Sequence, residues 1–495
     1  MEKVLLLCLI FWIPHLNGQE NNVSTDYSAA HRLLLNHQFS SCEKFIRDAD
    51  LTDVEEVYLS SLSGFMQLHL QGQKADFQNF TDDTRKRLKA IENRQDKEAQ
   101  FTQAVVLLQS SVSHARFEQY FTAVFKFKKA YKLTHLLIQK HPEYMPAKML
   151  YGTMLVLFGS IPDNFEWMLN LLNIEGQTQK GLNILEDVFH HQYHKEDSKY
   201  KEESLMLLTF AYCKFKPESS RLNDVFQHYH QPEIDKLITS SPVIRYNAVD
   251  LAKKTANNEQ ALAYMRRTYP EHPEIPFYYL DYYMKGLSLL QKLDFKAKRY
   301  FEAYIDQYPG EIYKKAAVQK IAWIALLEDS KNAYRKAFDR INDFSFNAQG
   351  SDGAAQKEFD NKDIPNTYLL KVRLLFDGGY YEKALKELMS HNPSHIYSSE
   401  EDRMEFIYRL GRIHHKLKDY PKAISYYKMT VDLGKEKKYY FAANAALQMG
   451  IIYTEQNKHK KARQVLKQCL DMNPDSYKSG IHRKAKACLK EIPVK

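Results

Sequence analysis

Apolar residues recur every three or four positions along much of the chain, which is the spacing of one face of an α-helix. Leu205, Leu208, Tyr212 and Phe215 form one such stripe. Turn residues are sparse, because only 17 Gly and 16 Pro serve 495 residues, too few for a multi-stranded β protein. The pattern therefore predicts an all-α fold of long helices, and the 44% of hydrophobic residues allows a large core.

The clearest internal repeat is a set of evenly spaced small residues. Ala384, Ala423 and Ala462 follow one another at equal intervals, and Gly411 and Gly450 each stand at the same distance before the next alanine. Packed helices lie about 8–10 Å apart, and only small side chains allow so close an approach. The spacing predicts helical hairpins in which these residues mark where the two helices cross.

These residues resemble the tetratricopeptide repeat, a helix-turn-helix unit of about 34 residues. The resemblance implies a superhelical solenoid of hairpins that binds other proteins and has no catalytic site. The longer period here leaves about five extra residues per unit. We expect them in longer second helices and in connecting turns such as residues 434–439.

Two alanines nearer the N-terminus keep the family's spacing to a proline that ends the second helix. Ala130 precedes Pro142 by the same interval by which Ala297 precedes Pro309 and Ala462 precedes Pro474. Ala130 and Ala297 are therefore expected to be packing residues of two diverged units.

A second resemblance covers roughly residues 117–212. Residues 151–162 read YGTMLVLFGSIP, and Trp167, Gly176 and Gly181 follow. This stretch resembles the tetratricopeptide repeat protein 39 and inclusion-body-clearance family, whose members are intracellular helical repeat proteins implicated in binding and in lipid-droplet or inclusion handling. The resemblance implies the same fold and brings no catalytic residues.

Residues 1–18 have the features of a secretory signal. Lys3 precedes the apolar run from Val4 to Ile13, and Gly18 supplies a small residue for cleavage. The run is too short to cross a bilayer, which takes about 20 residues. Cys8 lacks the small residues that precede a lipid-modified cysteine. We expect an exported protein, periplasmic or secreted, without a transmembrane span.

The organisation expected for the chain is a signal peptide, a long diverged array, a loop, a regular array and a cap. Gly350, Ser351, Asp352 and Gly353 suggest the loop, and the final helix should cover the last apolar surface of the array. The predicted ranges are 1–18, 19–343, 344–365, 366–476 (three regular units) and 477–495.

Charge is concentrated at the C-terminal end. Residues 411–495 hold 19 Lys or Arg against 7 Asp or Glu, whereas the whole chain carries +9. Such an excess would attract an anionic partner, for example an acidic protein segment. The alternative is a solvated lysine-rich exterior. The candidate residues, called the turn lysines below, are Lys435, Lys437, Lys438, Lys458, Lys460 and Lys461.

Little else points to chemistry. His190 and His194, with Glu186 one turn earlier, could form a metal-binding ridge, but a solvated polar helix end is the better interpretation. Cys469 and Cys488 fall on neighbouring predicted helices and could form a disulfide, although buried thiols are the simpler interpretation. Nucleophile-elbow and phosphate-binding glycine motifs are absent. We expect no enzymatic activity, no cofactor, no metal and no nucleic-acid partner.

The leading functional hypothesis is an interaction scaffold in the cell envelope or secreted space that holds partner segments on the concave face of its repeats. The alternative is an envelope protein that binds a glycan or lipid, in the manner of the starch-utilisation proteins of the SusD type. Those proteins are lipid-anchored, and this chain lacks the required cysteine. A metal-dependent hydrolase around His190 and His194 is a third, weaker hypothesis.

Overall fold

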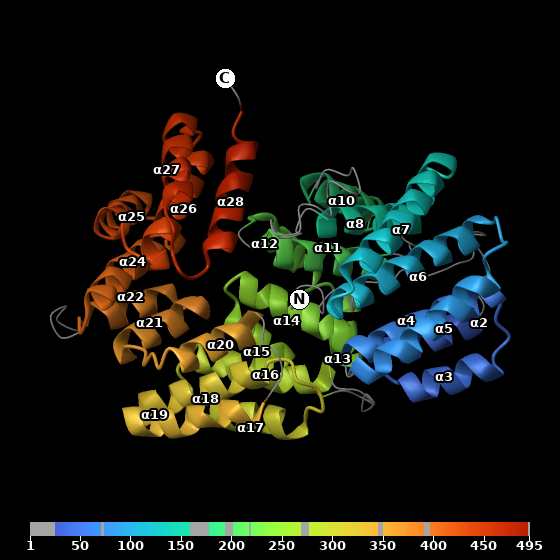
Figure 1. Ribbon diagram of the computed structural model, residues 1–495, viewed down its shortest axis with the longest axis horizontal. Helices are drawn as coiled ribbons and strands as arrows, with labels where there is room; N and C mark the ends of the chain where they lie inside the picture. The colour runs from blue at the N-terminus through green and yellow to red at the C-terminus, as the bar shows by residue number, and fades with distance from the viewer. Residues whose placement is uncertain are drawn as a thin grey trace. The chain divides into compact units, whose positions relative to one another are not determined.

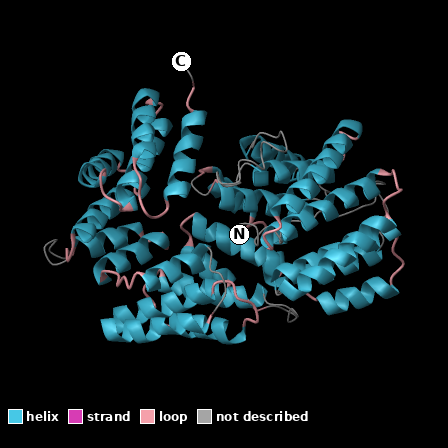
Figure 2. Cartoon of the chain, viewed as in Figure 1, coloured by secondary structure: helices cyan, strands magenta, loops and turns pink. Residues whose placement is uncertain are grey.

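The computed structural model describes residues 25–70, 74–158, 178–193, 201–216, 219–268, 277–344, 350–390 and 397–493. Regular structure in these ranges is helical, without a strand (Figure 2). The predicted all-α class is confirmed. No helix in these ranges combines the length and the apolar character that a membrane span requires. The predicted signal peptide, residues 1–18, lies outside the described residues.

The chain divides into two compact units. Unit 1 comprises residues 1–287, 297–321 and 338–357, and unit 2 comprises residues 288–296, 322–337 and 358–495.

The helices up to the middle of the chain belong to unit 1 (Figure 1). They are α2 (Thr25–Leu35), α3 (Phe39–Asp48), α4 (Asp53–Leu70), α5 (Lys74–Ala90), α6 (Lys97–Arg116), α7 (Tyr120–Lys140), α8 (Met145–Phe158), α10 (Thr178–Tyr193), α11 (Lys201–Phe215), α12 (Arg221–His228), α13 (Pro232–Ser240), α14 (Pro242–Lys254) and α15 (Asn258–Tyr264).

The later helices include four that the division between the units cuts, namely α16, α18, α19 and α20. They are α16 (Phe277–Leu290), α17 (Ala297–Gln307), α18 (Lys314–Glu328), α19 (Lys331–Phe338), the 3₁₀ helix η3 (Asp339–Asp343), α20 (Gly350–Asp360), α21 (Thr367–Asp377), α22 (Tyr381–Met389), α24 (Glu400–Lys416), α25 (Tyr420–Gly434), α26 (Tyr440–Glu455), α27 (His459–Asp471) and α28 (Lys478–Glu491).

Helices α2–α15 and helices α21–α28 pack mainly against their neighbours in sequence, as the predicted solenoid requires. In unit 2 the hairpins are α21–α22, α24–α25 and α26–α27, and α28 closes the series against α26 and α27. The first helices also contact one another in order, α21 with α24, α24 with α26, and α26 with α28. Unit 2 is thus a stack of hairpins whose first helices form one layer.

At least seven of the described hairpins turn in the same way. A residue just after the first helix has a positive φ of 55° to 80°, and the next N–H donates to the carbonyl five residues earlier at 2.7–3.0 Å. This is the Schellman motif, which satisfies carbonyls at the helix end. The turn residues are His37, Glu118, Ala256, Leu293, Gly379, Lys418 and Asn457.

The predicted loop at residues 344–365 contains a helix, α20, over Gly350–Asp360. The Asp352 carboxylate accepts the N–H groups of Tyr313 and Ala316 at 2.8 and 2.9 Å. Tyr313 directly precedes α18 and Ala316 lies in its first turn, where N–H groups have no carbonyl of their own helix to bond. A segment rich in Gly, Ser and Asp is thus helical here, and its Asp352 side chain caps the start of α18.

Candidate protein-interaction surfaces of the C-terminal repeats

The two predicted glycines lie where paired helices approach most closely. A Cβ at Gly411 would lie 2.7 Å from the Tyr427 ring, and one at Gly450 would lie 2.4 Å from a Leu466 methyl group. Tyr427 and Leu466 belong to the second helix of each hairpin and are fully buried. Glycine is therefore required by space at both crossings, because real Cβ atoms do not approach so closely.

The predicted alanines are all buried on second helices. Ala384, Ala423 and Ala462 each lie five positions after a left-handed turn residue. The N–H of each alanine donates to the backbone carbonyl four positions before it. Ala297 begins α17 and is equally buried. A side chain larger than alanine would separate the helices at these points.

Ala130 is buried but has a different register from the one that the proline spacing suggested. The residue five positions after the turn residue Glu118 is Ala123, which is 2% exposed. Ala130 lies seven residues further on, at the position that Thr430 and Cys469 occupy in the C-terminal hairpins. The distance to Pro142 pointed to the wrong alanine because α7 has a different length from the later second helices.

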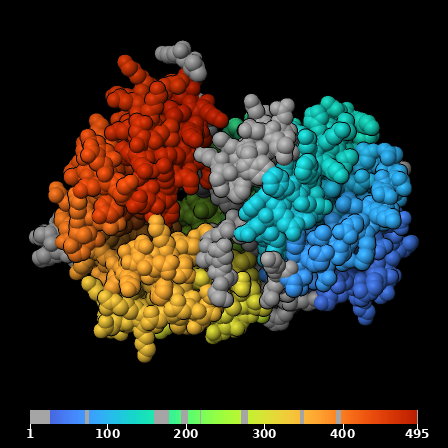
Figure 3. Space-filling view, viewed as in Figure 1, coloured from blue at the N-terminus to red at the C-terminus, as the bar shows by residue number. Residues whose placement is uncertain are grey.

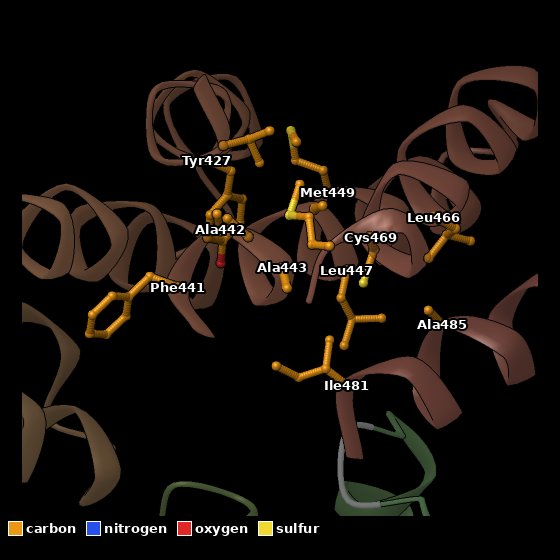
Figure 4. Packing of buried hydrophobic residues seen from close by; sticks show 14 of the residues in the cluster. Tyr427, Phe441, Ala442, Ala443, Leu447, Met449, Leu466, Cys469, Ile481 and Ala485 are labelled. Carbon is orange, nitrogen blue, oxygen red and sulfur yellow. The ribbon is translucent and has the colours of Figure 1, made fainter. Parts of the chain in front are cut away.

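Close packing of the C-terminal hairpins produces one continuous core, which Figure 4 shows from nearby. The core joins Tyr427 of α25, Leu447 of α26 and Leu466 of α27 to Ile481 and Ala485 of α28. This core fixes the spacing of the exposed faces on which a partner could bind.

The turn lysines are all exposed, but the structure does not bring them together. Lys435, Lys437 and Lys438 lie before α26, whereas Lys458, Lys460 and Lys461 lie after it. The 16 residues of α26 separate the two groups by about 24 Å. Lys437 already pairs with Glu400 at 2.9 Å. The six residues therefore form two small clusters and not one continuous patch.

Sequence reasoning missed a polar network on the first helices, which we call the α24–α26 network. Its members lie three or four residues apart on one face of each helix. They are Glu405, Tyr408, Arg409 and Arg412 on α24, and Asn444 and Gln448 on α26.

Hydrogen bonds join the two helices through the Tyr408 hydroxyl. It accepts from Arg412 Nη1 at 3.1 Å and from Asn444 Nδ2 at 2.9 Å, and the Gln448 amide donates to Asn444 at 3.3 Å. Arg412 also lies over the Phe376 ring of α21, 5.0 Å from its centroid. The first helices of three hairpins thus contribute to one polar face.

Burial and the Glu405 carboxylate have opposite effects on the pKa of Arg409. Burial lowers the pKa of Arg409, but the Glu405 carboxylate, 2.6 Å away, outweighs that effect and raises the pKa above its ordinary value. Arg409 is therefore a fixed cation that is already paired. Arg412 is half-buried and, as a planar guanidinium, can present donors in the fork geometry that matches a carboxylate.

The predicted histidine ridge falls only partly within the described residues. His190 and His191 end α10, whereas His194 lies outside the described residues. Within the described ranges no three His, Cys, Asp or Glu side chains gather as metal ligands would. Cys42, Cys213, Cys469 and Cys488 are thiols. Burial, and then the neighbouring Cys488, raises the pKa of the Cys469 thiol to about 12.

Residues 403–475 match the family model described as the tetratricopeptide repeat. The match spans nearly all of α24 and the whole of α25, α26 and α27, including Gly411, Ala423, Gly450 and Ala462. The chain therefore contains tetratricopeptide repeats in this range. The more specific resemblance to the tetratricopeptide repeat protein 39 family is not confirmed.

The chain is similar to a number of solved structures, of which two are described below, and no curated protein sequence matches it. One is described as "Crystal structure of APC/C hetero-tetramer Cut9-Hcn1", with 12% identity, 94% of this chain and 95% of that chain covered, and a TM-score of 0.27. The other is described as "Structure of Naa15/Naa10 bound to HypK-THB", with 15% identity, 94% and 65% covered, and a TM-score of 0.22. TM-scores this low do not establish a shared arrangement of helices.

Proposed function

We propose that the protein is a non-enzymatic interaction scaffold that binds a partner-protein segment on the α24–α26 network. The single observation that carries the proposal is the row of donors across neighbouring first helices, within the segment that matches the repeat family. Arg412 and Asn444, both half-buried, offer N–H groups to a carboxylate or to the backbone carbonyls of a bound segment, and the buried Gln448 donates to Asn444. The turn lysines would add long-range attraction for an acidic partner.

The setting that we propose is the periplasm or the secreted space. The support is the signal-like sequence of Lys3, the apolar run after it and the small residue Gly18. Expression of the full chain in its own host, followed by N-terminal sequencing of the protein from each cell fraction, tests this setting. A mature protein that begins near residue 19 in an extracytoplasmic fraction is the expected result, and an uncleaved cytoplasmic protein would contradict it.

Site-specific photo-crosslinking tests the binding surface. A photoreactive amino acid at position 444, on the proposed face of α26, should capture a protein in cell extract. At position 464, an exposed position on α27, it should not. Arg412→Glu, combined with the probe at 444, should reduce the crosslinked product about tenfold, the equivalent of about 1.4 kcal/mol.

The proposed surface requires both more capture at position 444 than at position 464 and a loss of capture in Arg412→Glu. Equal capture at 444 and 464, or capture that Arg412→Glu leaves unchanged, would contradict binding through the α24–α26 network. Stabilisation by an oligosaccharide or a lipid in a thermal-shift screen, without protein capture, would instead favour a small-molecule role.

A further inference from the structure

The described part of unit 1 contains a groove that sequence reasoning did not find. It has a volume of about 910 Å³ and is formed by α5, α6, α7 and the turn after α5. Its cationic lining comes from two helices that α6 separates in the chain, and Glu92 is the one acidic residue of the lining. The cations are Arg85 and Lys89 of α5 and Lys126, Lys129 and Lys132 of α7.

The positive charge of this groove is largely uncompensated. Helix α7 has no acidic residue in its 21 positions. Arg85 pairs with Asp82 at 3.2 Å, but both side chains are exposed, and such pairs contribute little. No acidic side chain among the described residues lies within ion-pair distance of the four lysines. Burial, followed by Lys129 and Arg85, lowers the pKa of Lys126.

Apolar side chains accompany the cations. Leu107, Leu133 and Leu136 line the groove, and Leu136 is 39% exposed. Phe125 lies one turn before Lys129 on α7 and is 58% exposed. Residues 125, 129, 132 and 136 follow helical spacing, so a stripe on α7 carries both apolar and cationic groups. The three helices fall within the blue to cyan part of the surface in Figure 3.

We propose that this groove binds an acidic peptide segment of a partner protein, one that carries apolar residues between its Asp and Glu side chains. The α7 positions that line the groove run from Thr122 to Leu136, a length of about 21 Å. An extended segment rises about 3.3 Å per residue, so about six residues would fill it. A cleft lined by one sign of charge focuses its field on such a ligand.

The geometry favours a peptide over a lipid surface. Lys126 is half-buried within the groove, where a protruding carboxylate can reach it and a flat layer of headgroups cannot. The leucines would contact the apolar side chains of a peptide. This inference goes beyond the proposed function, because the groove and the α24–α26 network belong to different units.

Binding of fluorescent peptides to the full chain tests the inference. The probes are a set of peptides of about ten residues each, in which the number of Asp or Glu residues among Leu and Phe residues varies. The double variant Lys126→Glu/Lys129→Glu should reduce the affinity for the tightest-binding peptide at least about tenfold. The matched control Lys128→Glu/Lys140→Glu makes the same charge change at exposed α7 positions outside the groove and should change the affinity less than about twofold.

Each outcome bears on the inference. Equal losses in the two double variants would show non-specific attraction to a basic helix and would overturn it. Binding of acidic peptides no tighter than lysine-containing versions would also overturn it, as would a preference for vesicles of anionic lipid that the groove variant abolishes. Arg412→Glu should leave peptide binding intact, so a failure here is distinct from a failure of the proposed function. Circular dichroism confirms that each variant is folded.

Discussion

Single residues control how closely the repeat helices pack. Gly450 and Gly480 are both helical glycines near the C-terminal end, yet their surroundings differ completely. A Cβ at position 450 would meet Leu466 Cδ2 at 2.4 Å and Cγ at 2.6 Å, whereas one at position 480 would meet nothing within 4 Å. The same substitution should therefore have opposite effects at the two positions.

Gly450→Ala should destabilise the protein by about 1–2 kcal/mol. Overpacking costs about 1–3 kcal/mol, and alanine recovers up to about 1 kcal/mol because glycine is the poorer helix former. Gly480→Ala should stabilise it by about 0.5–1 kcal/mol, since only the helix preference changes. Urea denaturation followed by circular dichroism measures both. Equal shifts at the two positions would mean that the hairpin crossing does not require glycine.

The hairpin is the element that the sequence reveals only in part. Close approach restricts residue type, so Ala384, Ala423 and Ala462 could be found from their spacing. The left-handed turn five positions earlier could not, because backbone geometry alone defines it and non-glycine residues occupy it in most hairpins, such as Glu118 and Lys418. The proline spacing predicts Ala130 as a packing residue, and Ala130 is buried, but the alanine in the register of Ala423 and Ala462 is Ala123.

The candidate binding surfaces also lay beyond sequence patterns. Lysines in turns are visible in a sequence, but which lysines share a surface depends on how helices pair. Lys89 and Lys126 come together only because α5 and α7 both pack on α6. The turn lysines fall in two turns that are close in sequence, and the length of α26 separates those turns in space.

Helix α11 contains a buried acid whose ionisation depends on the helices around it. Glu203 is 5% exposed, α11 packs against α8, α10, α12 and α14, and no described group hydrogen-bonds its Oε2. Burial, followed by repulsion from Glu202, raises the pKa of Glu203 well above its ordinary value of 4.5. Because the folded state favours the protonated acid, its contribution to stability is full below pH 4.5 and is lost as pH rises through the folded-state pKa.

Glu203→Gln should therefore stabilise the protein at neutral pH and not in acid. We expect a gain of about 1–3 kcal/mol at pH 7, comparable to the cost of a buried polar group without a partner. The gain should vanish below pH 4.5, where both side chains are neutral. Thermal unfolding at a series of pH values from acidic to neutral measures the difference in stability between Glu203→Gln and the parent protein. Glu382→Gln, at an exposed position of α22, is the control. A gain that does not change with pH would contradict the assigned ionisation.

At the scale of the whole molecule, a stack of hairpins has no natural end, because each hairpin offers an apolar face to the next. Helix α28 covers that face on α26 and α27. Ile481, Ala485 and Ile492 are buried in the shared core, and in Figure 4 the first two lie near Leu447 and Cys469. The role of a cap, inferred from the apolar stripe of this helix, thus has a specific structural basis.

Undocking α28 should cause self-association as well as lost stability. Ala485→Asp places an unpaired charge at a fully buried position, which is severely unfavourable, so the helix should leave the core. Loss of the two buried isoleucines alone costs about 3–6 kcal/mol. The apolar face of α26 and α27 would then be open to a second copy, and analytical ultracentrifugation should detect dimers or larger species.

Ala487→Asp is the control, because it changes the charge of the same helix at an exposed position and should remain like the parent protein. If Ala485→Asp unfolded only locally and did not associate, the buried face would be too small to drive association, and α28 would be a stabilising helix and not a cap against assembly.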